Sequence, residues 1–268
     1  MKKLAIFVLA ALLATSLVAC TAEGDDLNSI NDYIAPSYTE KVATGTLTFA
    51  EGVGESAIIT DYVGLYTAHE VVIPDTIQDR KVVSIGKEAF YYCTAATAIK
   101  IPETVEVIED WAFAGCTSLE TIVIPAAVQS IGKGAFNGCT SLKTVIFEGE
   151  NLVTIADYAF NDCTALESIV LPSSVTTIGV QAFRDCEALA SFTTPASLEK
   201  IGDMAFYGCT GLNTDGALVL GESITEIGEF AFVDINKLYI KTTEGSYAAE
   251  YVEAMRDFEE TETETEEE

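Results

Sequence analysis

The amino-acid sequence predicts an α/β repeat solenoid, a right-handed coil with a parallel β-sheet on one face and short helical or irregular segments on the other. The dipeptide Ala-Phe recurs seven times, at intervals of 23, 23, 24, 23, 23 and 26 residues, and a fixed period in this range is the signature of a solenoid. Three positions after each of the first six of these Phe residues comes a Cys, and an alternating apolar pair such as Ile122 and Ile124 then indicates a short strand. We expect the repeated residues to form a structural ladder, which comprises Phe90, Phe113, Phe136, Phe160, Phe183, Phe206 and Phe232 together with Cys93, Cys116, Cys139, Cys163, Cys186 and Cys209.

One complete unit reads Ile-Gly-x-x-Ala-Phe-x-x-Cys-x-x-Leu-x-x-Ile-x-Ile-Pro-x-x-Val, where x varies between units. This pattern resembles the bacterial surface leucine-rich repeats of the BspA-like family, over roughly Ala57 to Phe258. The resemblance implies a leucine-rich-repeat coil and a cell-surface protein that binds a protein partner, in adhesion or in contact with a host or with other cells. Repeats are scaffolds whose activity depends on variable surface positions, so the pattern leaves the ligand open.

The N-terminus has the features of an export signal. Met1-Lys2-Lys3 is basic, and Leu4 to Ala19 carries no charge over sixteen residues, which is shorter than the ~20 residues needed to span a bilayer. We therefore expect residues 1–19 to be a lipoprotein signal peptide, with an uncleaved anchor as the alternative. The junction Leu17-Val18-Ala19-Cys20 is similar to the bacterial lipobox. This resemblance implies that Cys20 carries acyl chains such as palmitate and holds the exported protein to a bacterial membrane at the cell surface.

Composition divides the chain after the signal into further segments. Residues 20–41 contain Gly, Asp, Asn and Ser with little apolar periodicity, which predicts a flexible tether. Residues 42–74 should form a hairpin-like N-terminal cap and the first strand, because the end coil of a solenoid would otherwise expose its core. The leucine-rich repeats follow over residues 75–243. In the fourth unit Glu148-Gly149-Glu150-Asn151 replaces the usual Pro and adds one residue, which predicts a loop.

A glycine recurs at one turn position of the repeat, as Gly86, Gly132, Gly179, Gly202 and Gly228. We expect the backbone there to need either a positive φ or close approach to the next coil. Other residues stand at this position in two units, so the requirement is not absolute.

The C-terminal segments differ sharply from the repeats. Residues 244–258 predict a capping helix, in which Ser246 suits the N-cap and Tyr247, Tyr251, Met255 and Phe258 share one face at helical spacing. Residues 259–268 are seven Glu and three Thr, so we expect an acidic disordered tail.

Charge excludes some partners. The chain has 42 acidic and 14 basic residues, a net charge of −28. The tail does not account for this, because Lys41 to Phe258 alone contains 30 acidic and 12 basic residues, a net charge of −18. We expect no binding to nucleic acid and repulsion from anionic lipid surfaces. A solvated surface explains most of the charge, and a cationic host protein or divalent ions are further candidates for partners.

Six repeated cysteines in an exported chain would ordinarily suggest disulfides. Their identical position in successive coils argues otherwise, because equivalent residues of neighbouring strands lie ~4.8 Å apart, whereas a disulfide requires Cβ atoms ~3.8 Å apart. We favour buried thiols stacked as small apolar side chains. Some disulfides, or a metal site, are the alternatives, although no His accompanies these residues and no C-x-x-C occurs.

Catalysis finds little support, and we predict no catalytic residue, cofactor site or metal site. His69 is the sole histidine and has no catalytic partner nearby in the sequence. Gly132-Lys133-Gly134 falls on the repeat grid and lacks the full fingerprint of a nucleotide-binding loop. Carboxylates are numerous enough to pair by chance, and a glycosidase would need a cleft that a regular solenoid does not offer.

The outward positions of the predicted strands form three columns, of alternating charge, of hydroxyls and of β-branched side chains. Strand propensity alone could produce the last two columns. Aromatic residues are absent from them, which favours a protein or peptide ligand over a sugar. The candidate ligand face comprises Lys100, Glu120, Thr121, Val123, Lys143, Thr144, Ile146, Glu167, Ser168, Val170, Ser191 and Thr193.

These observations leave three hypotheses for function. The first is a lipid-anchored binding module whose repeat face engages a protein partner, as the family resemblance implies. The second is a structural or assembly component of the bacterial envelope, and the third, more remote, is an enzyme.

Overall fold

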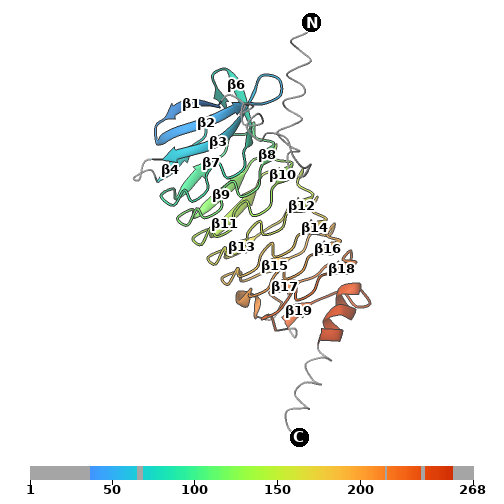
Figure 1. Ribbon diagram of the computed structural model, residues 1–268. Coiled ribbons are helices and arrows are strands. Elements are labelled where there is room, and N and C mark those ends of the chain that lie inside the picture. The colour runs from blue at the N-terminus through green and yellow to red at the C-terminus, as the bar shows by residue number, and fades with distance from the viewer. Residues whose placement is uncertain (1–36, 65–68, 215, 237–238, 256–268) are drawn as a thin grey trace, which may run out of the picture.

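The computed structural model describes residues 37–64, 69–214, 216–236 and 239–255. These residues form an elongated solenoid in which successive coils stack from the N-terminal cap to a C-terminal helix (Figure 1). The solenoid with parallel sheets that the repeat predicts is therefore confirmed. The predicted signal peptide, Cys20, the predicted acidic tail and Phe258 lie outside the described residues.

An antiparallel three-stranded cap covers the N-terminal end of the coil. Strands β1 (Ser37–Val42), β2 (Gly45–Glu51) and β3 (Ser56–Gly64) pair in order, and Leu47 and Phe49 are fully buried beneath them. We expected the tether to continue to residue 41, and the structure corrects this boundary. Strand β1 pairs with β2 along its whole length, and the Tyr38 ring stacks on Phe49 with centroids 5.4 Å apart. Alternate side chains of β1 are partly buried. The polar composition of this segment did not predict that packing.

The predicted strands of the repeat form a parallel ladder along one face of the coil. A five-stranded sheet comes first, and a bridge between Ser168 and Ser191 leads on to a three-stranded one. The strands are β4 (Glu70–Val72), β7 (Ala98–Lys100), β9 (Thr121–Ile124), β11 (Thr144–Phe147), β13 (Ser168–Ile169), β15 (Phe192–Thr193), β17 (Leu218–Val219) and β19 (Ile240–Lys241).

A second parallel ladder, which the sequence analysis did not predict, runs beside the first (Figure 1). It is built from the short segments that end at the Ile before the turn position where Gly recurs, and it continues the cap because β3 pairs in parallel with β6. Its strands are β6 (Arg80–Ile85), β8 (Val107–Ile108), β10 (Ser130–Ile131), β12 (Thr154–Ile155), β14 (Thr177–Ile178), β16 (Lys200–Ile201) and β18 (Glu226–Ile227). Strand β5 (Thr76–Ile77) makes a hairpin with β6 in the first unit, where Pro74 and Phe90 are 16 positions apart against 11 for Pro125 and Phe136.

Turns close each coil on the remaining side, where the described repeats contain only the short 3₁₀ helix η1 (Thr210–Leu212). The turn backbones hydrogen-bond to the next coil, as in the bond from Phe136 N to Ala159 O at 2.9 Å. The expected helical or irregular segments are therefore mostly irregular.

The seven Phe residues of the ladder are buried and stack in an unbroken column through the centre of the coil. Successive ring centroids lie 5.2–5.8 Å apart, with planes inclined by 2–22°. Offset stacking at such distances contributes about 0.5–1.5 kcal/mol per pair beyond the burial of the rings. Tyr62 extends the column at the cap, with its ring centroid 5.1 Å from that of Phe90.

The six repeat cysteines are free thiols in the structure. From Cys116 onward each Sγ donates a hydrogen bond to the carbonyl oxygen of the ladder Phe in the preceding coil, at 3.0–3.3 Å. Burial raises the pKa of the Cys163 thiol. Cys93, in the first coil, is only partly buried. These hydrogen bonds connect the thiol of each coil to the backbone of the preceding coil.

A helix over residues 247–255 closes the C-terminal end. The Ser246 Oγ accepts a hydrogen bond from Ala249 N at 3.2 Å, which is the geometry of an N-cap. The helix buries Ala248 and Val252, whereas Tyr247 is 41% exposed, so its predicted place on the packed face is wrong. The helix is rotated toward the small Ala248 side chain, which allows closer contact with the last coil than a second large ring would.

Candidate ligand-binding face

The structure places the twelve residues of the candidate ligand face together on the solvent side of the first ladder. Eleven of them are exposed and Thr144 is partly buried. Strand register aligns the hydroxyl column, because Thr144 pairs with Thr121 on one side and with Ser168 on the other. Val123 likewise pairs with Ile146.

The charged column contains one direct ion pair. Lys143 Nζ lies 3.3 Å from Glu120 Oε2, and both side chains are about half exposed. Such a surface pair contributes only about 0–1 kcal/mol, so it orders the border of the face more than it stabilises the fold.

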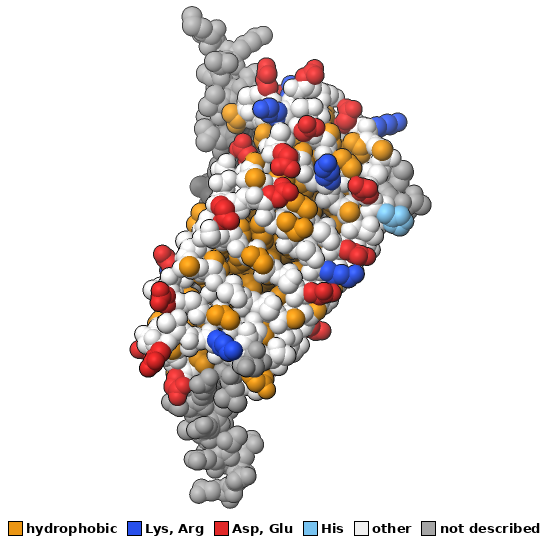
Figure 2. All heavy atoms as spheres, turned by 180° about the vertical axis from the view of Figure 1, so that it is seen from behind, with side chains coloured by type: hydrophobic (Ala, Val, Ile, Leu, Met, Phe, Trp, Pro, Cys, Tyr) orange, Lys and Arg blue, Asp and Glu red, His pale blue; other side chains and the backbone are white. Residues whose placement is uncertain are grey.

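The β-branched column is the most apolar exposed feature of this ladder. Val123 is 37% exposed, Ile146 is 45% exposed and Val170 is 83% exposed. Val72, which was not among the predicted residues of the face, is 47% exposed and pairs with Lys100 at the N-terminal end of the same column. The alternation of apolar residues in the first strand was the signal that could have found it. Figure 2 shows one face of the molecule on which hydrophobic side chains gather along the middle of the solenoid, flanked by scattered carboxylates.

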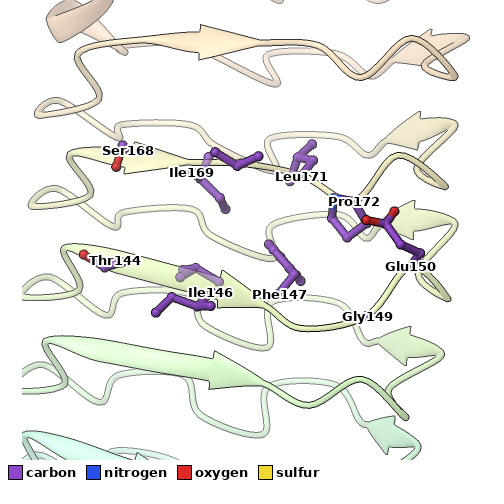
Figure 3. Close-up of a pocket in the computed structure, with 11 residues that line it drawn as sticks. Thr144, Ile146, Phe147, Gly149, Glu150, Ser168, Ile169, Leu171 and Pro172 are labelled. Atoms are coloured by element: carbon purple, nitrogen blue, oxygen red, sulfur yellow. The ribbon is translucent and has the colours of Figure 1, made fainter.

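An open hollow lies on the face between β11 and β13, the strands of the fourth and fifth coils. Its volume is about 340 Å³, and its lining includes Val170. Ile146, Phe147 and Leu171 also line it (Figure 3). Its cause is local, because the chain that leaves β11 enters Glu148-Gly149-Glu150-Asn151, which contains the additional residue of the fourth unit.

Phe147 contributes apolar surface to the hollow. Its strand partner Ile124 occupies the equivalent inward position and is 2% exposed, but Phe147 is only partly buried. The ring therefore contributes to the lining of the hollow instead of being enclosed in the coil.

One carboxylate, that of Glu150, lines the hollow, and Glu148 and Glu167 adjoin its lining residues in the chain. Glu148 follows β11 directly and is exposed, and Glu167 is exposed beside Ser168. Glu150 accepts hydrogen bonds from Ser173 N at 2.6 Å and from Ser173 Oγ at 2.8 Å, which fixes the loop against the next coil. Neither Glu148 nor Glu167 lies within 4 Å of a described Lys or Arg nitrogen.

The described residues show no feature of a metal-binding or a membrane-spanning helical protein. Within the described ranges, no three His, Cys, Asp or Glu side chains are grouped so that they could hold a metal ion. In the same part of the chain, no helix is both long and apolar enough to cross a bilayer. His69 lies beside the start of β4, and its backbone carbonyl accepts hydrogen bonds from Thr97.

Residues 83–213 and 181–251 match the model of the BspA type leucine rich repeat region, in six copies. The chain belongs to this family. The family and its fold are typically non-enzymatic, and leucine-rich-repeat proteins generally bind protein partners. No curated protein matches the chain.

Solved structures of other leucine-rich-repeat proteins are similar. A T. pallidum leucine-rich-repeat protein is 32% identical, with a TM-score of 0.63 over 74% of this chain and 96% of that one. A leucine-rich-repeat protein from Eubacterium ventriosum ATCC 27560 is 29% identical, with a TM-score of 0.62 over 75% of this chain. The match covers 50% of the latter protein's own chain.

Proposed function

We propose that this BspA-type protein is exported, held to a bacterial membrane through lipid on Cys20, and binds a protein partner with the exposed face of its first ladder. The partner interaction serves adhesion or contact with a host or with other cells. The observation that carries the proposal is the exposed apolar column Val123, Ile146 and Val170, bordered by the charged column that includes Glu120 and Lys143.

This arrangement has the features of a small interface. Protein interfaces combine an apolar centre with a polar rim that remains in contact with water, and soluble proteins seldom expose a contiguous apolar patch without use. The column continues over several coils because the strands are in register, so it fits an extended surface of another protein. The net charge of −28 favours a partner with basic groups and disfavours nucleic acid.

Membrane attachment is supported by the sequence of residues 1–20 alone. The uncharged stretch that ends in Leu17-Val18-Ala19-Cys20 suits a cleaved and lipidated precursor. Two or more acyl chains would hold the protein stably, whereas a single chain would hold it marginally.

The test is a comparison of partner capture by wild type and by a variant in which Val123, Ile146 and Val170 are replaced together by Ser. Thermal stability should change little, by about 0.5 kcal/mol per site, because these side chains point outward. Capture of a partner identified by cross-linking should weaken at least tenfold. Val153→Ser, which alters an exposed Val outside this face, is the matched control and should bind as wild type does.

The source of the partner separates adhesion from a role in envelope assembly. Adhesion predicts a partner in host extracts, whereas a structural or assembly component would capture one from the producing cell's own envelope. Unchanged capture by the triple variant from both sources would show that the binding face lies elsewhere.

A further inference from the structure

The hollow between β11 and β13 is a built irregularity in an otherwise repeating surface. Regular units continue from the strand into Pro, as in Ile124-Pro125 and Leu171-Pro172, and the residue before that Pro is buried. The fourth unit instead continues from Phe147 into Glu148-Gly149-Glu150-Asn151, and Phe147 is only partly buried. This irregular unit and the strand that follows it line an open hollow on the face.

Apolar side chains line this place from both strands. Ile146 and Phe147 come from β11, while Val170 and Leu171 follow β13 (Figure 3). A volume of about 340 Å³ is at the lower end of the range for ligand sites. Because the hollow is open to solvent, it suits one side chain presented by a larger partner better than a small molecule that must be enclosed.

The negative charge around the hollow further restricts the kind of partner that can bind there. Glu148 and Glu167 are exposed and form no ion pair with any described Lys or Arg. Glu150 adds a third carboxylate at the end of the hollow opposite Ser168 (Figure 3). The nearest cation of the face, Lys143, is engaged by Glu120. An incoming group would meet an apolar floor surrounded by uncompensated negative charge, which attracts cations.

We propose that the hollow is the specificity pocket of the binding face and takes one large aliphatic or aromatic side chain from an extended peptide segment in which Lys or Arg flanks that residue. This inference rests on the proposed function, because it assigns the chemistry of the segment that the face binds. The apolar residue fills the space between the strands, and the flanking cations pair with the carboxylates of Glu148, Glu150 and Glu167.

The experiment uses synthetic nine-residue peptides labelled with fluorescein and the full-length chain, with binding measured by fluorescence polarisation. One peptide has Leu at its centre and two Lys on each side. The matched peptides replace the central Leu by Ser, or all four Lys by Glu. We expect the Leu-centred Lys peptide to bind at least tenfold more tightly than either, and tenfold corresponds to about 1.4 kcal/mol.

Three variants locate the binding. Val170→Asp places a charge at the hollow. Replacing Glu148-Gly149-Glu150-Asn151 by Pro-Ala-Ala gives the fourth unit the same length and turn sequence as the third unit and should close the hollow. Both should abolish the preference for Leu over Ser. Val153→Asp makes the same change at an exposed Val outside this face and should retain the preference. Circular dichroism and thermal unfolding verify that each variant folds.

Two results would overturn the assignment. Equal binding of the Leu and Ser peptides would mean that the acidic surface attracts any polycation. A preference for Leu that survives in Val170→Asp and in the shortened variant would place the pocket elsewhere. The proposed function is judged separately, because loss of partner capture in the triple Ser variant would support it even where the peptides fail.

Discussion

Replacement of Phe136 by Ala tests whether the aromatic column carries the stability of the solenoid. Phe136 is fully buried and stacks on Phe113 at 5.3 Å and on Phe160 at 5.4 Å, with planes inclined by 8° and 2°. Loss of a buried Phe ring costs about 3–5 kcal/mol, and the cost rises when the surroundings cannot collapse into the cavity.

The structure places the change in the upper part of that range. Hydrogen bonds from Phe113 N to Ala135 O at 2.8 Å and from Phe136 N to Ala159 O at 2.9 Å fix the spacing of the three coils. Neighbouring rings therefore cannot move together to fill the space. We expect a loss of about 4–5 kcal/mol in the free energy of unfolding, which at a slope of about 2 kcal/mol/M lowers the urea midpoint by about 2 M.

Urea denaturation followed by circular dichroism is the assay, with Phe230→Ala as the matched control. Phe230 is 56% exposed and has a φ of 58°. Ala in its place keeps the same backbone conformation, so the change should be below about 1 kcal/mol. Repeat arrays can unfold in parts, so hydrogen exchange should also show faster exchange confined to the coils around residue 136. A loss below about 1.5 kcal/mol, or one equal to that of the control, would refute the column as the principal core.

The remaining predictions concern the anchor and the thiols. Cys20→Ala should abolish labelling by a palmitate analogue and leave an uncleaved or released protein, and retention with normal mature mass would contradict lipidation. Native alkylation should label Cys93 slowly and the five other repeat thiols only after denaturation without reductant, and a requirement for reductant would indicate disulfides instead. Burial, and then the neighbouring Cys116, raise the pKa of Cys93 from its ordinary 9.0 to about 11. A pKa raised by folding contributes stability below the ordinary value and loses it as pH approaches the folded value, so the unfolding midpoint should fall between pH 9 and 11. Replacing Cys93 by Ala should reduce that fall, and an unchanged alkaline decline would assign it to other groups.

The local pattern of residues was enough to predict the coil and its interior. Apolar positions recur with one period, so Phe136 and Phe160 must occupy equivalent places, and alternation around Ile122 and Ile124 indicates which side chains turn inward. The outward columns follow from the same alternation. Their alignment across coils follows from the recurring pattern, which keeps its register although the units vary from 23 to 26 residues in length.

Contacts between coils could not be predicted from the sequence, because they depend on distances that the packing of the whole stack sets. The recurrent Gly132 left two explanations open, and the structure decides for close approach, since a Cβ there would lie 2.5 Å from Asp110 N. Positive φ occurs elsewhere in the turn, at Trp111 and Tyr158, residues that do not suggest it. The thiols donate hydrogen bonds to carbonyl oxygens one coil away. The spacing of Cys and Phe in the sequence does not predict these bonds.

The hollow was decided by tertiary structure alone. The sequence shows one additional residue in the fourth unit and predicts a loop there. Whether that residue bulges outward or opens a space depends on how the side chain before it packs, and Phe147 is only partly buried where its strand partner Ile124 is enclosed. A sequence repeat fixes which residues are equivalent, whereas the shape between two coils depends on how each one packs against the next.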